Sequence, residues 1–185
     1  REALVKIEKS LNDQIFETHL LFGVTGSGKT EVYLQAIEKA LKAGKGTIML
    51  VPEISLTAQT IERFRSRFKE KIAILHHRLS QGERNDEWHH IREGRAKIVI
   101  GARSAIFSPV MDLGLIIVDE EHEQSYKQND LYPCYQARDV AVMRGKLTNS
   151  TVVLGSATPS LESYYNTQTG KYTLSVLHHR ADSAT

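Results

Sequence analysis

The sequence predicts an α/β domain in which a doubly wound, mainly parallel β-sheet carries helices on both faces. Short apolar runs recur along the 185 residues, and each run is continuous rather than alternating. Strands that are buried on both faces of a parallel sheet have this pattern. Segments with helical spacing lie between the runs, and such sheets bind their ligands beyond the carboxyl ends of the strands.

The expected strands are short and rich in Ile, Leu and Val, and they cover residues 20–22, 47–51, 72–75, 98–100, 115–118 and 152–154. Helices are expected where apolar residues recur every three or four positions, at residues 31–41, 57–68, 83–93 and 137 to about 147. The stretch 124–136 is expected to be irregular. A loop of this length in a compact domain is more often functional than idle.

Composition limits the classes of protein that fit. The formal net charge is +2, so any nucleic-acid-binding surface must be local. A single cysteine, Cys134, excludes an internal disulfide framework and a cysteine-rich zinc site within the chain. No apolar run has the length of a membrane span and no signal peptide is seen, so we expect a cytoplasmic protein. Residues 1–185 are expected to form one domain of a longer protein, because the chain opens within helical character.

A P-loop follows the first expected strand. Residues 23–30 read Gly-Val-Thr-Gly-Ser-Gly-Lys-Thr, and a helical pattern comes next. The glycines can adopt positive φ, so that backbone N–H groups surround a phosphate at the start of the helix. The lysine is expected at the β and γ phosphates, and the last hydroxyl is expected on Mg²⁺. The candidate nucleotide-binding residues are Gly23, Val24, Thr25, Gly26, Ser27, Gly28, Lys29 and Thr30.

An acidic motif, Asp-Glu-Glu-His, follows the strand at 115–118. Asp119 is expected to hold Mg²⁺ together with Thr30, partly through water. Glu120 is placed to orient and activate the attacking water. His122 could bond to a γ-phosphate or to the loop at Gly155, or it could be an ordinary satisfied polar residue. The catalytic candidates are therefore Lys29, Asp119, Glu120 and His122.

Three further strand ends carry candidate contacts. Ser156 and Thr158 could relay the presence of the γ-phosphate, or the segment could simply lead into a helix that Ser160 caps. Ser55, Thr57 and Arg103 are groups that can hold a phosphate backbone, although Ser55 could be an N-cap and Arg103 a structural ion pair. One basic run is expected to be a solvated helix face: Arg63, Arg65, Arg67, Lys69 and Lys71.

The order of these motifs resembles that of the first RecA-like motor lobe of superfamily 2 helicases. The resemblance is closest to the bacterial replication-restart DNA helicases and runs over nearly the whole chain. It rests on Gly-Val-Thr-Gly-Ser-Gly-Lys-Thr-Glu-Val-Tyr, Val-Pro-Glu-Ile-Ser-Leu-Thr, Gly-Ala-Arg-Ser-Ala-Ile-Phe-Ser-Pro, Asp-Glu-Glu-His-Glu-Gln-Ser-Tyr-Lys-Gln and Gly-Ser-Ala-Thr-Pro-Ser. The Ser-Tyr-Lys-Gln continuation is its most specific part.

The resemblance implies an ATP- and Mg²⁺-dependent 3′-to-5′ DNA helicase that acts on forked or single-stranded DNA. It also implies other primosome proteins and single-stranded DNA-binding protein as partners, and zinc only in a module outside this chain. Tyr126 and Lys127 would belong to an aromatic-rich loop that senses DNA, although the loop tyrosines could instead pack the loop onto the domain. The chain departs from the family pattern at Gln136 and at His77, where histidine and serine are expected.

Other readings of the P-loop remain open. A regulatory switch should hydrolyse nucleotide without a nucleic-acid stimulus. A transporter ATPase module should carry a signature loop before its acidic motif, and the sequence contains none. Another superfamily 2 DNA-repair translocase would share the P-loop style but lack the combination of motifs described above.

Overall fold

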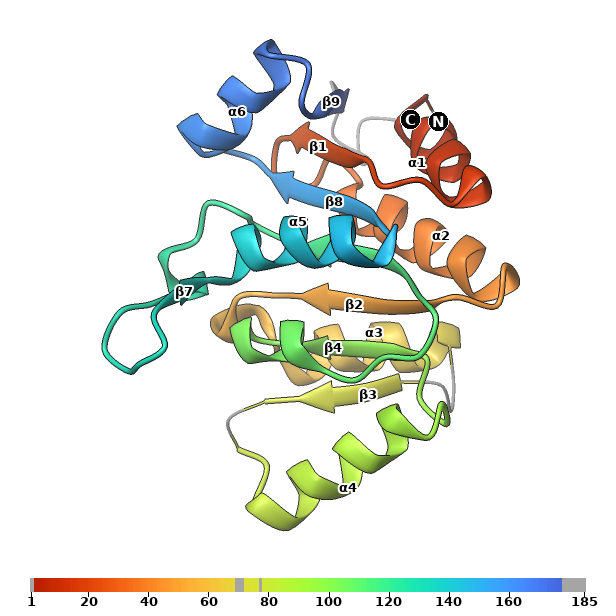
Figure 1. Cartoon of the computed structure of the whole chain (residues 1–185), viewed down its shortest axis with the longest axis vertical. Coiled ribbons are helices and arrows are strands. Elements are labelled where there is room, and N and C mark those ends of the chain that lie inside the picture. The colour runs from red at the N-terminus through yellow and green to blue at the C-terminus, as the bar shows by residue number, and fades with distance from the viewer. Residues whose placement is uncertain (1, 69–71, 77, 178–185) are drawn as a thin grey trace.

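The computed structural model describes residues 2–68, 72–76 and 78–177, and a seven-stranded sheet lies at its centre (Figure 1). The strands are β1 (Thr18–Gly23), β2 (Gly46–Leu50), β3 (Ile72–Leu75), β4 (Ile98–Gly101), β5 (Leu113–Val118), β8 (Thr151–Ser156) and β9 (Thr173–Leu177). Their order across the sheet is β3-β4-β2-β5-β8-β1-β9, and every neighbouring pair is parallel. The predicted parallel sheet is therefore confirmed.

Helices cover both faces of the sheet. They are α1 (Glu2–Asp13), α2 (Lys29–Lys42), α3 (Ala58–Phe68), α4 (Gln81–Arg92), α5 (Ala137–Thr148) and α6 (Leu161–Gln168). The first three pack on one face, whereas α4 and α5 pack on the other. This confirms the doubly wound arrangement. Within the described residues, every helix is too short or too polar to cross a membrane.

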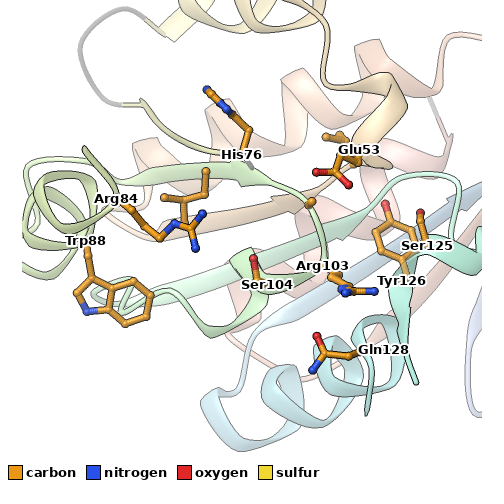
Figure 2. Close-up of a pocket in the computed structure, with 12 residues that line it drawn as sticks. Glu53, His76, Arg84, Trp88, Arg103, Ser104, Ser125, Tyr126 and Gln128 are labelled. Carbon is orange, nitrogen blue, oxygen red and sulfur yellow. The ribbon is translucent and has the colours of Figure 1, made fainter. Parts of the chain in front are cut away.

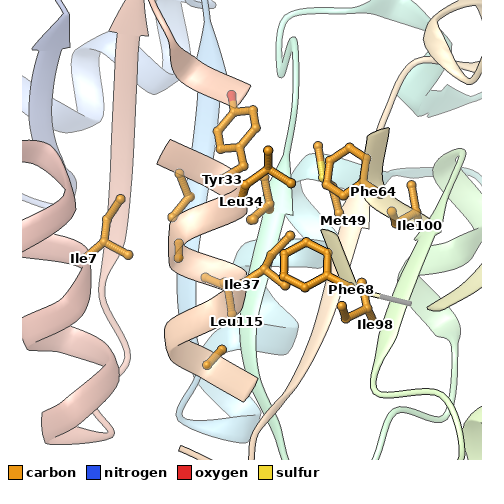
Figure 3. Packing of buried hydrophobic residues seen from close by; sticks show 14 of the residues in the cluster. Ile7, Tyr33, Leu34, Ile37, Met49, Phe64, Phe68, Ile98, Ile100 and Leu115 are labelled. Carbon is orange, nitrogen blue, oxygen red and sulfur yellow. The ribbon is translucent and has the colours of Figure 1, made fainter. Parts of the chain in front are cut away.

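The strands are continuously apolar because consecutive side chains enter two different cores. In β1, Leu20 packs into the core under α4 and α5, and Leu21 packs into the core under α1, α2 and α3. Figure 3 shows the second of these cores, where Ile37 of α2 and Phe68 of α3 lie close together above the sheet. Each such buried side chain contributes about 1.5–3 kcal/mol relative to an exposed one.

One helix start corrects the sequence analysis and another confirms it. Thr57 caps α3, because its Oγ1 accepts a hydrogen bond from the Thr60 backbone N–H at 3.2 Å. Ser55 is not the cap; it ends the short 3-10 helix η1 (Glu53–Ser55). The expectation that Ser160 caps a following helix is confirmed, since its side chain accepts from the N–H of Ser163 at 3.3 Å.

The stretch expected to be irregular contains short ordered elements. After the 3-10 helix η4 (Gln124–Tyr126), β6 (Lys127–Gln128) pairs antiparallel with β7 (Tyr135–Gln136). A ladder of two residues on each side is too short to produce a recognisable alternation of apolar and polar residues in the sequence. The turn between β6 and β7 projects from the body of the domain (Figure 1). Tyr132 lies in this turn with 95% of its surface exposed.

Candidate nucleotide-binding site

The P-loop and the acidic motif meet in a cavity of about 330 Å³ at the carboxyl ends of β1 and β5. Its lining residues are Thr25, Gly26, Gly28, Lys29, Thr30, Glu31, Arg63, Asp119 and Glu120. The two motifs are about 90 positions apart in the sequence. They come together because β1 and β5 are parallel strands whose carboxyl ends share one edge of the sheet.

The glycines of the P-loop serve two different purposes. Gly26 and Gly28 have φ values of 80° and 90°, which side chains rarely tolerate. Gly23 does not have positive φ, so that part of the sequence interpretation is wrong. A Cβ atom on Gly23 would lie 2.5 Å from the Ser27 Oγ, so this glycine is needed for close approach of the loop. The loop then runs directly into α2.

Lys29 lies inside the cavity, with 7% of its surface exposed. Its ammonium group donates a hydrogen bond to the Gly23 carbonyl at 2.7 Å and lies 4.0 Å from the Glu120 Oε1. The cation therefore stands between the P-loop and the acidic motif. Together with the N-terminus of α2, it makes a cradle whose charge and shape fit a phosphate group.

Asp119 is fixed by two hydrogen bonds. Its backbone N–H donates to the Leu50 carbonyl at 2.9 Å, and its Oδ1 accepts from the Tyr33 hydroxyl at 2.9 Å. Burial raises the pKa of Asp119, and the Tyr33 hydrogen bond opposes that shift. A buried carboxylate is stabilised by a nearby cation, so Asp119 and Thr30 fit a Mg²⁺ ion. The described residues contain no group of three or more His, Cys, Asp or Glu side chains that could hold a metal by itself.

His122 connects the acidic motif to the end of β8. Its Nδ1 lies 2.7 Å from the Ser156 Oγ and 3.7 Å from the Glu120 Oε2. The Ser156 Oγ also accepts from the Thr158 backbone N–H at 2.9 Å. Of the alternatives for His122, the structure therefore shows the contact with the loop at Gly155, since Ser156 directly follows that glycine. The two coupling candidates lie in one chain of hydrogen bonds with the acidic motif, although Thr158 takes part through its backbone.

Glu121 is a structural residue for which the sequence analysis predicts no role. Its carboxylate is fully buried and accepts from the backbone N–H of Ser160 at 2.7 Å, from the Ser160 Oγ at 3.0 Å and from the Ser163 Oγ at 2.9 Å. Arg138 of α5 donates to it at 3.1 Å. The acidic motif is thereby attached to both α5 and α6. In the sequence, the only signal of this arrangement is the pair Ser160 and Ser163, which are three residues apart at the start of a helix.

The described arginines of the basic run on α3 are exposed, as predicted. Arg63 also lines the nucleotide cavity, which the sequence analysis does not anticipate. Arg67 lies 3.2 Å from Glu38 and 3.7 Å from Glu31, both on α2. Lys69 and Lys71 lie outside the described residues. The spacing of two residues along the run gives no sign that one arginine lines the nucleotide cavity, because that depends on how α3 packs beside α2.

The candidate DNA contacts are distributed over three cavities. Arg103 lines a second cavity, of about 440 Å³, and its Nη1 donates to the Lys127 carbonyl at 3.1 Å. Lys127 itself is exposed. Ser55 lines a cavity of about 310 Å³ that also includes Asp119, and Thr57 lines another of about 670 Å³. The partner of Arg103 is a carbonyl, so the structural ion pair considered above is absent among the described residues.

Tyr126 requires a correction. Its ring is completely buried, and its hydroxyl donates to the Asp119 carbonyl at 2.6 Å. A buried ring offers no face on which a base can stack, so Tyr126 supports the acidic motif rather than contacting DNA in this structure. Tyr135 packs edge-to-face against Phe107, with ring centroids 5.1 Å apart. Of the loop tyrosines, Tyr132 alone is largely exposed in the described structure.

The two departures from the family pattern have different outcomes. Gln136 precedes α5, and its Oε1 is buried without a hydrogen-bond partner among the described residues. His77 lies outside the described residues.

Known proteins resemble this chain in sequence and in fold. Residues 7–167 match the family model described as DEAD/DEAH box helicase. The chain is 59% identical over 184 residues to Replication restart protein PriA of Chlamydia pneumoniae, and the alignment covers 100% of this chain and 25% of that protein. It is 52% identical over 182 residues to Replication restart protein PriA of Bacillus subtilis, covering 98% of this chain and 22% of that protein.

A solved structure supports the same comparison. RecG bound to a three-way DNA junction superposes with a TM-score of 0.64 at 27% sequence identity, covering 96% of this chain and 23% of that one. The chain thus spans about a quarter of the length of the curated relatives that it matches.

Proposed function

The chain belongs to the DEAD/DEAH box helicase family, and on that premise we propose that it is the ATP-binding motor lobe of a replication-restart DNA helicase. One observation carries the proposal: Lys29, Asp119 and Glu120 meet in a single cavity beside the N-terminus of α2. The high identity to the replication restart proteins over the whole chain supports the choice of activity.

The residues of the cavity have different roles in ATP hydrolysis. The P-loop N–H groups and Lys29 hold the β and γ phosphates. Thr30 and Asp119 hold Mg²⁺, which when bound neutralises charge on the phosphates. Glu120 takes a proton from the attacking water, and its Oε1 lies 4.0 Å from the Lys29 ammonium group. His122 and Ser156 then connect this event to the end of β8.

The activity of the whole protein is also part of the proposal. The lobe would belong to a longer cytoplasmic protein that moves 3′-to-5′ on single-stranded or forked DNA. A second motor lobe and a zinc module would lie outside this chain. Other primosome proteins and single-stranded DNA-binding protein are the proposed partners, by similarity to the replication restart proteins.

Lys29→Ala tests the proposal. In the polypeptide that contains this lobe, we expect DNA-stimulated ATP hydrolysis to fall by at least about 10²-fold, because the ammonium group supplies charge at the transferred phosphate. The folded structure should persist by circular dichroism. Lys171→Ala removes an exposed lysine far from the cavity and should hydrolyse ATP normally. A Lys29→Ala protein within about twofold of wild type, less than 1 kcal/mol of barrier, would disprove the assignment.

The rate of ATP hydrolysis with different DNA molecules distinguishes the alternative functions. A regulatory switch or a transporter module should hydrolyse ATP at the same rate with and without DNA. A DNA-repair translocase is the second candidate, because the RecG structure superposes over most of the chain. Stimulation by a three-way junction but not by a fork with a single-stranded arm would favour that candidate.

A further inference from the structure

The second cavity, which we call the Trp88 pocket, lies at the carboxyl ends of β3 and β4 (Figure 2). It has a volume of about 440 Å³ and shares no lining residue with the nucleotide cavity. Arg84 and Trp88 of α4 form one wall, and Tyr126 and Gln128 form the opposite wall. Its volume is in the range of roughly 300–1,000 Å³ that is typical of ligand sites.

Trp88 is not required by the hydrophobic core. It lies on a polar helix whose single buried residue is Ile91, and 38% of its surface is exposed. Its indole lines the pocket together with Arg84, one helical turn earlier. In the described part of the chain, the guanidinium group of Arg84 makes no hydrogen bond or ion pair. An exposed aromatic face and an uncommitted cation therefore lie side by side.

The other lining groups favour a negatively charged, planar ligand. Arg103 adds a second guanidinium group, and Ser104 and Gln128 add hydrogen-bonding side chains. Glu53 is the single carboxylate among the lining residues, so cations outnumber anions in the pocket. Aromatic faces that accept any base, combined with cations that contact the backbone, are how proteins bind single-stranded nucleic acid.

We propose that the Trp88 pocket holds one unpaired base of a DNA strand, stacked on the indole of Trp88, with Arg84 on the adjacent phosphate. This inference rests on the proposed function, because it names where the DNA of that activity is contacted. The base lies on the α4 side of the pocket. Tyr126, whose hydroxyl holds the Asp119 carbonyl, forms the opposite wall.

The fluorescence of the chain reports on this pocket directly, because Trp88 is its only tryptophan. The 185-residue chain is titrated with oligo(dT) and with an oligonucleotide of the same length whose central sugars are abasic. Binding is followed in parallel by the anisotropy of a dye on the DNA. We expect oligo(dT) to quench Trp88 as it binds and the abasic DNA to bind with much weaker quenching.

Two outcomes of the titration would overturn the proposal. Saturated binding of oligo(dT) without quenching would place the DNA elsewhere, and equal quenching by abasic DNA would exclude stacking. Thymidine monophosphate is the third ligand in the series. If it quenches Trp88 and oligo(dT) does not, the pocket is a mononucleotide site and the proposal of a strand contact is wrong.

Substitutions give an independent measurement. Trp88→Ala should weaken oligo(dT) binding by about 5- to 150-fold, the usual value of one stacked base, whereas Trp88→Phe should retain most of the affinity. Arg84→Ala should lower the slope of log K against log salt by about 0.7, corresponding to one phosphate on a single strand. Tyr165→Ala and Arg92→Ala are the matched controls, an exposed aromatic residue on α6 and an exposed arginine on α4 that do not line the pocket.

A failure of the pocket inference can be distinguished from a failure of the proposed function. If Trp88→Ala binds DNA as well as Tyr165→Ala does, while DNA still stimulates ATP hydrolysis that depends on Lys29, the pocket inference is wrong and the function stands. If the polypeptide containing this lobe shows no DNA-dependent ATP hydrolysis, the proposed function is wrong.

Discussion

Glu120 is held in an uncommon backbone conformation by its neighbours. Its φ is 47°, and the residues on either side are fixed by the hydrogen bonds Asp119 N–H to Leu50 and Glu121 N–H to Gly155, at 2.9 and 3.0 Å. A non-glycine residue in this region costs about 1–3 kcal/mol, and such positions are frequent at active sites. The conformation directs the carboxylate of Glu120 into the cavity beside Lys29.

Glu120→Gln should therefore separate binding from turnover. An amide cannot accept the proton of the attacking water, so we expect ATP turnover to fall by about 10²–10⁴-fold while Mg²⁺-ATP binding is retained. Affinity for a fluorescent ATP analogue and the steady-state rate are measured on the same protein. Glu162→Gln, on the exposed surface of α6, is the control. Loss of nucleotide binding would mean that Glu120 has a structural role.

The close packing of Tyr33 against Gly155 also constrains the site. A Cβ atom on Gly155 would collide with the hydroxyl of Tyr33, which holds Asp119. We expect Gly155→Ala to destabilise the fold by about 1–3 kcal/mol, as overpacking does. Tyr33→Phe in the same background removes the colliding oxygen and should restore part of the loss. Denaturant unfolding of the two single variants and the double variant measures this coupling; strictly additive effects would contradict it.

The sequence shows the candidate nucleotide-binding groups more clearly than it shows the residues that support them. The P-loop residues are contiguous, so their pattern is visible in one window. Tyr33 contacts Asp119 across 86 positions, and Glu121 contacts Ser160 across 39. Such contacts depend on the packing of strands and helices, which no local pattern contains. Tyr126 illustrates the reverse error: its place in a loop suggests contact with DNA, but the structure buries its ring.

At the scale of elements, a polar cluster joins α1, β1 and β9 at one edge of the sheet. His19 of β1 is buried, and its Nε2 lies 3.0 Å from the Ser10 Oγ of α1. The hydroxyls of Ser10 and Thr173 each donate to Glu17, at 2.5 Å. Burial lowers the pKa of His19, against a smaller opposing effect of Glu17; Lys6 adds to the lowering. Burial alone would raise the pKa of Glu17, but the two hydroxyl donors, His19 and Lys9 hold it below its usual value.

This cluster predicts that the fold loses stability in acid in two stages. Below the ordinary histidine pKa of 6.5, the unfolded chain takes up a proton that buried His19 does not, so stability falls as pH falls. Below 4.5 the unfolded chain protonates Glu17 before the folded one does, and stability falls again. His19→Gln should flatten the dependence of the melting temperature on pH between 7.5 and 5.5. His90→Gln on the exposed side of α4 should not, and an unchanged slope in His19→Gln would contradict the prediction.

A physical reason explains why the sequence does not predict the last strand, β9. The five interior strands and the edge strand β3, whose side chains pack into both cores, read as continuous apolar runs, and the sequence predicts all six. β9 is an edge strand with a single fully buried residue, Ser175, so its pattern is mixed and polar. Its pairing with β1 comes from backbone hydrogen bonds that any side chain permits. Patterns of burial predict strands only where both faces are covered.

At the scale of the whole molecule, the parallel sheet brings both cavities to the same edge. Tyr126 lines the Trp88 pocket, and its hydroxyl holds the carbonyl of Asp119, which lines the nucleotide cavity. Arg103 adds a second connection through the carbonyl of Lys127. A hydrogen bond therefore links a residue of the Trp88 pocket to the backbone of Asp119 in the nucleotide cavity. If the proposed function holds, this contact is a candidate route between DNA binding and ATP hydrolysis.

The last prediction concerns the chain by itself. The transition state of phosphoryl transfer gathers charge on the γ-phosphate, and an arginine directed at it is worth about 10³–10⁵ in rate. Arg63 is the one arginine that lines the nucleotide cavity of the described structure, and its side chain is exposed. We therefore expect the isolated chain to bind ATP weakly and to hydrolyse it at least about 10³-fold more slowly than a polypeptide with both motor lobes.

Single-turnover hydrolysis by the two proteins, with and without DNA, measures the difference. Arg63→Ala should change the slow rate of the isolated chain by no more than about threefold, because an arginine of the second lobe, rather than Arg63, is expected to reach the γ-phosphate. Full activity of the isolated chain would contradict the prediction. In that event a collapse of the rate in Arg63→Ala would identify α3 as the source of the missing charge, and the lobe would carry its own catalytic arginine.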